Sequence, residues 1–131
     1  MADVDLKTIA IGLLNEGGTT VSLAANGDTA LYTVPTGFRC VLSEAHLVAG
    51  ANTGATTVSI GGEASTYADF LPTNTLATSV QYDSFRLVPA TSTTAPLKKS
   101  YAAGTVIYAH VAAHAGGASN KAYLFGYLYP V

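Results

Sequence analysis

The sequence is poor in charged residues, has a single cysteine and contains no tryptophan. Only 11% of its 131 residues are Asp, Glu, Lys or Arg, against about a quarter in typical soluble proteins, while 49% are hydrophobic. So few charges cannot cover a domain of this size, and much of its surface must therefore be uncharged. Because large exposed apolar patches become interfaces in permanent assemblies, the composition favours a protein that is buried against other proteins.

Other absences exclude whole classes of protein. The lone Cys40 rules out an internal disulfide and a multi-cysteine metal site, and it suits a small buried hydrophobe. The basic residues form no cluster longer than the pair Lys98-Lys99 and the net charge is −2, which disfavours nucleic-acid binding. No run of 18 apolar residues predicts a membrane span. The acidic start, Met1 to Leu6, lacks the basic and apolar regions of a signal peptide, so we expect folding in the cytoplasm.

What the sequence does contain is turn signals at short intervals, a spacing typical of an all-β sandwich or barrel. They lie at 16–18, 26–28, 35–37, 51–54, 61–62 and 116–117. Asn26-Gly27 is a hairpin signal, and Pro35-Thr36-Gly37 predicts a fixed bend between two strands. The segments between the turns predict strands at 7–14, 19–25, 29–34, 38–49, 55–60, 66–71, 79–88, 104–113 and 121–129.

We therefore expect one domain over residues 1–131, an antiparallel β-sandwich with a jelly-roll-like fold and about eight or nine strands. Residues 1–14 are a candidate N-terminal arm. The Thr- and Ser-rich segment 89–100 is predicted to be a surface loop. Both segments are candidates for reaching neighbouring molecules.

Alternate residues of a strand point to opposite faces, which separates a core side from an outer side. Within 104–113 the core side is predicted to consist of Ile107, Ala109, Val111 and Ala113. The opposite side carries Tyr108.

The final segment has an aliphatic side and an aromatic side, and both favour burial. The aromatic side consists of Tyr123, Phe125, Tyr127 and Tyr129. A sandwich strand covers only one face with its own core, so the aromatic side predicts a covering loop, another subunit or a ligand. Tyrosine is enriched in protein interfaces, and we expect these four residues, with Tyr108 on a neighbouring strand, to be interface anchors.

Candidate catalytic and metal-binding patterns are weak. His110 and His114 would lie roughly 13 Å apart on one strand, too far to share a metal, and His46 stands alone. Ser43-Glu44-Ala45-His46 contains the residue types of a triad, but Ser43 points away from the other two on a strand. The glycine pairs lack the Gly-Lys-Ser/Thr of a phosphate-binding loop. We therefore predict no catalytic residue, metal, cofactor or small-molecule substrate, and no enzymatic activity.

Three short motifs resemble those of small structural proteins of tailed phages. They are Leu31-Tyr32-Thr33-Val34-Pro35-Thr36-Gly37, Thr56-Thr57-Val58-Ser59-Ile60-Gly61 and Tyr101-Ala102-Ala103-Gly104-Thr105-Val106-Ile107. In those proteins an LYTVPAG turn and a later glycine-led strand entry belong to a β-sandwich, and Thr36 stands here where alanine is common. The resemblance spans roughly residues 29 to 129, and its motifs are structural rather than catalytic.

The resemblance implies a virion component made in the cytoplasm of a host bacterium. We expect a capsid decoration, or cement, protein on the surface of the phage head that binds the major capsid protein and its own copies as a dimer or trimer. It would bind neither nucleic acid nor membrane. The alternatives are a tail- or fibre-associated protein or carbohydrate-binding β-sandwich module that uses the tyrosine side, and a small hydrolase that uses His46 or His110.

Overall fold

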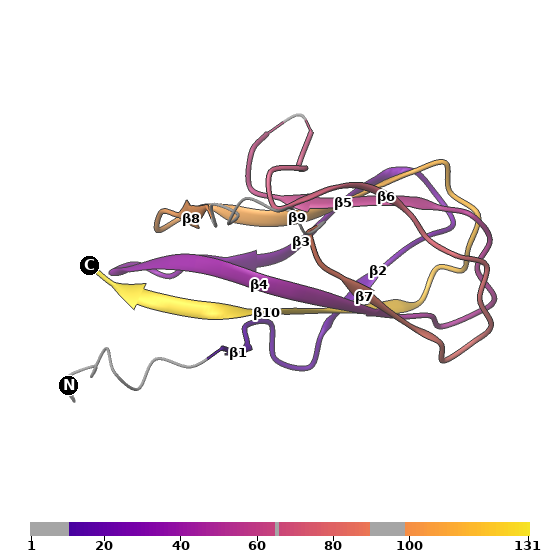
Figure 1. Ribbon diagram of the computed structural model, residues 1–131, viewed down its shortest axis with the longest axis horizontal. Coiled ribbons are helices and arrows are strands. Elements are labelled where there is room, and N and C mark those ends of the chain that lie inside the picture. The colour runs from indigo at the N-terminus through magenta and orange to yellow at the C-terminus, as the bar shows by residue number, and fades with distance from the viewer. Residues whose placement is uncertain (1–10, 65, 90–98) are drawn as a thin grey trace, which may run out of the picture.

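The computed structural model describes residues 11–64, 66–89 and 99–131. These residues form ten strands in two antiparallel sheets, which lie as two layers in Figure 1. One sheet contains β1 (Gly12–Leu13), β2 (Thr19–Val21), β4 (Phe38–Val48), β7 (Ser84–Leu87), β8 (Ser100–Tyr101) and β10 (Asn120–Pro130). The other contains β3 (Gly27–Thr33), β5 (Thr57–Gly61), β6 (Leu71–Thr75) and β9 (Val106–Ala112). Within the described part of the chain, no helix is long and apolar enough to cross a membrane.

The strand order is that of a jelly roll. In the six-stranded sheet β1 and β2 pair successively with one edge of β10, and β7 and β8 pair with the outer edge of β4, so each sheet has four strand positions. The orders are β1/β2–β10–β4–β7/β8 and β3–β9–β5–β6. Apart from the β5–β6 pair and these split edges, consecutive strands alternate between the two sheets, as in a double-sheet jelly roll. The predicted all-β, jelly-roll-like sandwich is confirmed.

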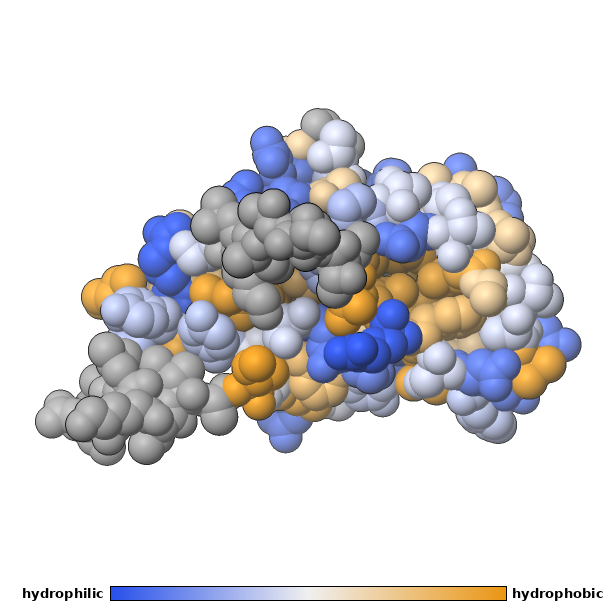
Figure 2. All heavy atoms as spheres, in the orientation of Figure 1, coloured by the Kyte–Doolittle hydropathy of each residue, from blue (hydrophilic) through white to orange (hydrophobic). Residues whose placement is uncertain are grey.

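One hydrophobic core fills the space between the sheets, and Figure 2 shows apolar residues between the two layers at the edge that faces the viewer. The predicted core side of β9 is confirmed, because Ile107, Ala109 and Val111 are all buried. Full burial of a valine or isoleucine side chain such as these stabilises the fold by roughly 1.5–3 kcal/mol. Cys40 is also fully buried, as predicted, and burial raises the pKa of its thiol to about 11. Ala113 was predicted to share this core but is exposed, since β9 ends at Ala112 and Ala113 turns the chain with a φ of 48°.

Several predicted strand positions are wrong. Segment 66–71 is irregular up to β6, which starts only at Leu71, and the strand predicted at 79–88 is shortened to β7. The hairpin expected at Asn26-Gly27 does not form, because β2 and β3 belong to different sheets. Strand β8 begins at Ser100, inside the predicted loop 89–100. Most of that loop (90–98), and the arm up to residue 10, lie outside the described residues.

The predicted bend at Pro35-Thr36-Gly37 is present between β3 and β4. The amide of Phe38 donates to the carbonyl of Pro35 at 3.3 Å, and Gly37 has a φ of 86°. Only glycine adopts that angle without strain, so the turn residues set the direction in which β4 enters the six-stranded sheet.

A β-bulge in the β4–β10 pair decides which β4 side chains face outward. The register passes from Phe125 opposite Glu44 to Gly126 opposite Leu42, and it leaves Ser43 without a partner on β10. Because of this extra residue, Cys40 and Leu42 before the bulge and Ala45 and Leu47 after it are all buried. Glu44 and His46 consequently lie on the outer face of the sheet.

The edge of the six-stranded sheet is interrupted between β1 and β2, and the side chain of Asn15 bridges the gap. Its Oδ1 accepts the amide hydrogen of Leu124 at 2.7 Å, and its Nδ2 donates to the carbonyl of Ala122 at 2.9 Å and to Thr19 Oγ1 at 3.0 Å. The buried amide thus makes the hydrogen bonds that a strand backbone would make.

We predict that Asn15→Ala lowers the free energy of unfolding by about 1–3 kcal/mol, because it leaves the Leu124 amide and the Ala122 carbonyl buried without partners. Urea denaturation measures this change. Asn74→Ala is the matched control, since the exposed Asn74 side chain bonds only to the nearby Pro72 carbonyl. Equal effects of the two substitutions would contradict the role assigned to Asn15.

Candidate functional site

The outer face of the six-stranded sheet carries the row of aromatic side chains predicted from the sequence. Tyr123, Phe125 and Tyr127 are half-buried, and Tyr129 is 46% exposed. They alternate along β10 with residues that face the core, so all four project from the same side of one strand. This row, together with the outward side chains of Glu44, His46 and Arg86, is called the aromatic face below.

Strand register brings three polar residues to the middle of the aromatic face. On β4, His46 lies opposite Tyr123 and Glu44 lies opposite Phe125. On β7, Arg86 lies opposite His46. The sequence separates Arg86 from Glu44 by about 40 residues, and only the β4–β7 pairing makes them neighbours.

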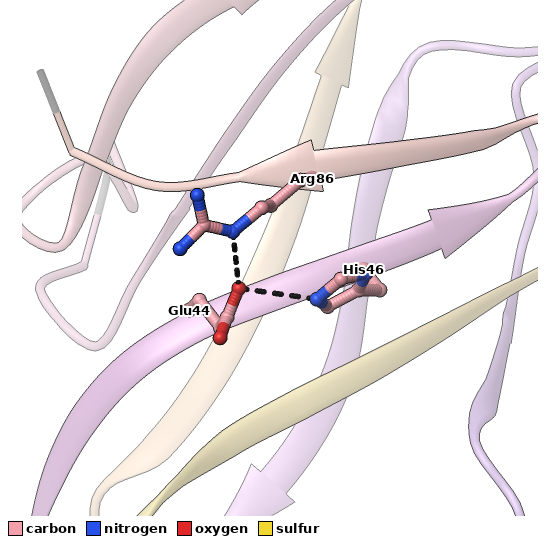
Figure 3. Close-up of polar contacts among 3 residues, drawn as sticks. All are labelled: Glu44, His46 and Arg86. Carbon is pink, nitrogen blue, oxygen red and sulfur yellow. Dashed lines mark hydrogen bonds and ion pairs between the residues drawn. The ribbon is translucent and has the colours of Figure 1, made fainter.

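Glu44 is the centre of this polar group (Figure 3). Its Oε2 accepts a hydrogen bond from Arg86 Nε at 2.7 Å and lies 3.1 Å from His46 Nε2. The Arg86 guanidinium holds the pKa of the Glu44 carboxyl below its ordinary value, with a smaller contribution from His46 against the opposing effect of desolvation. The His46 ring meets Phe125 edge-on, with ring centroids 5.4 Å apart, so the polar group and the aromatic row form one continuous surface.

More apolar side chains are exposed beside the aromatic row and at its end. Leu13 of β1 lies opposite Phe125, and both it and the preceding Ile11 are exposed. Val131, directly after β10, is also exposed. Exposed apolar side chains are ordinary when scattered, but these border the aromatic face and enlarge it.

The prediction that Tyr108 lies beside the aromatic row is wrong. Tyr108 belongs to β9 of the four-stranded sheet, on the opposite outer surface of the sandwich. Its ring packs on Tyr67, with centroids 4.5 Å apart. The physical reason is that β9 and β10, although consecutive, cross between layers instead of forming a hairpin.

The histidines have separate neighbours. His46 contacts Glu44, and Ser43 lies in the bulge, where the regular alternation of side chains is interrupted. His110 Nδ1 lies 2.5 Å from Asp28 Oδ1 on the paired strand β3, a contact that no sequence pattern indicated. His114 follows β9 and bonds to Asn26. Across the residues that the structure describes, no three His, Cys, Asp or Glu side chains cluster as metal ligands.

A second polar cluster connects the chain before β8 to the loop after β5. The side chain of Asp69 is nine-tenths buried, and it accepts the Gly62 amide at Oδ1 (2.9 Å) and faces Lys99 Nζ at Oδ2 (2.9 Å). Burial alone would raise the pKa of Asp69, but Lys99 and the Gly62 amide outweigh it and lower that pKa. Burial raises the pKa of the neighbouring Tyr101, and Lys99 Nζ lies 5.9 Å from the centroid of its ring. These contacts connect the segment before β8 to the loop after β5.

Comparison of this chain with models of protein families, with curated proteins and with solved structures yields no match.

We predict that Arg86→Gln raises the pKa of Glu44 toward its ordinary value, because it removes the guanidinium that stabilises the carboxylate. An NMR titration of the side-chain carboxyl carbon measures the shift. Arg39→Gln is the control, since Arg39 bonds to Ser100 rather than to Glu44. An unchanged Glu44 titration in Arg86→Gln would show that the pair does not persist in solution.

Proposed function

We propose that this protein is a structural component of a tailed-phage virion, a decoration protein that binds the major capsid protein of the assembled head and stabilises it. The observation that carries the proposal is the aromatic face, where four aromatic side chains stand partly exposed on the outside of a rigid sheet. The low charge of the chain supports the proposal, because a surface with few charges and exposed apolar groups favours burial against another protein. The resemblance of residues 31–37, 56–61 and 101–107 to phage structural proteins supports the assignment to a virion.

The aromatic face suits contact between copies of this protein. Aromatic side chains on a sheet face supply large contact areas with little loss of conformational freedom. Arg86 uses Nε to bind Glu44, and in Figure 3 its two terminal nitrogens point away from that carboxylate. They are available to carbonyl or carboxylate groups across an interface. A two-fold dimer would present the same aromatic row and the same polar centre from both sides.

Binding to the shell would stabilise the shell by mass action. A ligand that binds only the assembled state adds about 2.7 kcal/mol per site when its free concentration is 100 times Kd. An oligomer that contacts several shell subunits at once multiplies this effect without any new contact. This stabilisation needs no chemical step.

A second candidate function is carbohydrate binding by a tail- or fibre-associated protein. The convergence of Glu44, His46 and Arg86 beside Phe125 favours it, since sugar sites combine aromatic rings with polar groups that orient hydroxyls. If these residues bind sugar, host polysaccharide should bind saturably and compete with self-association for the aromatic face.

We predict that the double substitution Tyr127→Ser, Tyr129→Ser weakens self-association at least about tenfold, because it removes two aromatic anchors from the interface. Sedimentation velocity over a concentration series measures the change. Tyr108→Ser is the matched control, since Tyr108 lies on the outer face of the other sheet. A wild-type protein that stays monomeric at all concentrations would contradict the dimer or trimer.

The decoration function is tested by incubating the protein with shells that lack it and imaging them by cryo-electron microscopy. We expect density at regular lattice positions and a higher melting temperature of the decorated shells. Empty lattice positions at saturating protein would refute the decoration function. If the same protein instead bound host polysaccharide, with loss of binding in the Tyr127/Tyr129 double variant, the second candidate would replace it.

A further inference from the structure

Tyr82 is held in a backbone conformation that tyrosine disfavours. It occupies the third position of the turn Val80–Asp83, which precedes β7, and its φ is 72°. Glycine or asparagine is the usual residue at a turn position with positive φ, and an ordinary side chain there is strained because its Cβ approaches the backbone too closely. Other contacts must therefore hold Tyr82 in this conformation.

Two of the hydrogen bonds at this turn close it, and two others fix it to its surroundings. The amide of Asp83 donates to the Val80 carbonyl (3.1 Å), and the amide of Val80 donates to Asp83 Oδ2 (3.0 Å). The amide of Tyr82 donates to the carbonyl of Ala49, next to the end of β4, at 2.7 Å, and the Gln81 amide donates to Asn52 Oδ1 at 3.2 Å. The turn is thus a rigid projection of the six-stranded sheet.

The ring of Tyr82 buries too little surface within its own chain to offset this strain. The residue is 77% exposed, and its neighbour Val80 is 58% exposed. Tyr67 makes the contrast clear, because it also has a positive φ (44°) but packs its ring on Tyr108. For folding alone, glycine would serve better at position 82. A strained, rigid and exposed aromatic residue indicates a contact outside the chain.

The turn lies away from the aromatic face. In Figure 1 the connection from β6 to β7 runs around the end of the molecule opposite to the N and C labels. The nearby side chains of Asn52 and Gln81 are uncharged, and the carboxylate of Asp83 is bound to the Val80 amide. A shallow hollow lined by Asn52, Thr53, Thr78, Val80 and Asp83 adjoins the turn. Such an end, with one carboxylate among uncharged polar groups, fits an apolar pocket with a polar rim on a protein rather than a polyanion.

We propose that Tyr82, flanked by Val80, is the anchor by which this protein inserts into an apolar pocket of the capsid shell, while the aromatic face joins its own copies. This inference rests on the proposed decoration function. It predicts opposite signs for folding and binding. Replacing Tyr82 by glycine relieves the strain and removes the anchor, so stability is kept or raised while binding to the shell is lost.

The experiment compares the wild type with Tyr82→Gly, Tyr82→Asn and Tyr82→Phe. We expect Tyr82→Gly and Tyr82→Asn to melt no lower than the wild type and to bind shells at least about tenfold more weakly, as loss of an interface hot spot does. Tyr82→Phe keeps the ring and should bind within about threefold of the wild type. Calorimetry measures melting, and cosedimentation with shells that lack the protein measures binding.

Tyr67→Gly is the matched control, since it changes a positive-φ tyrosine on a different surface, and it should leave shell binding unchanged. Self-association should be the same in all Tyr82 variants. Shell binding by Tyr82→Gly equal to that of the wild type would overturn the anchor and leave the decoration function standing. Absence of shell binding by the wild type would overturn both. A lower melting temperature of Tyr82→Gly and Tyr82→Asn would refute the strain on which the inference depends.

Discussion

The pairing of β4 with β10 is the contact on which both surfaces of the six-stranded sheet depend. These are the two longest strands, each of 11 residues, and they lie side by side in the middle of the sheet. The bulge at Ser43 shifts their register by one residue. Without it, either Cys40 and Leu42 or Ala45 and Leu47 would leave the core. The same shift turns Glu44 and His46 outward beside Phe125, so one irregularity serves the core and creates the candidate site.

A chain with few charges must satisfy its buried backbone by other means, and this one uses amides. Asn15 replaces the missing strand backbone between β1 and β2. Asn120, which is fully buried, donates to the carbonyls of Val21 and Gly117 and accepts the amide of Gly50. An amide side chain donates and accepts at once, and it costs less to bury than an ion. These amides therefore satisfy the buried backbone groups at the sheet edge without an ionised side chain.

Local patterns predicted those parts of the fold that local chemistry determines. The class of fold, the bend at Pro35-Thr36-Gly37, the buried Cys40 and the aromatic side of the last strand all follow from turn residues and period-two alternation. Contacts between distant strands did not follow. The Glu44–Arg86 pair needs the β4–β7 register, and the separation of Tyr108 from β10 needs knowledge of which layer each strand joins. The irregular path of 66–70 was misjudged because apolar and β-branched residues there support a loop that packs Tyr67 on Tyr108. The strained angle at Tyr82 has no signature in the sequence.

The burial of Cys40 has a practical consequence for the protein outside a reducing environment. A thiol attacks disulfides and reacts with oxidants as its thiolate, and here both the raised pKa of about 11 and the absence of solvent contact suppress that form. Oxidants therefore cannot reach the sulfur of Cys40, and neighbouring copies cannot be cross-linked through it. The same fold can persist unchanged when it passes from a reducing medium into air.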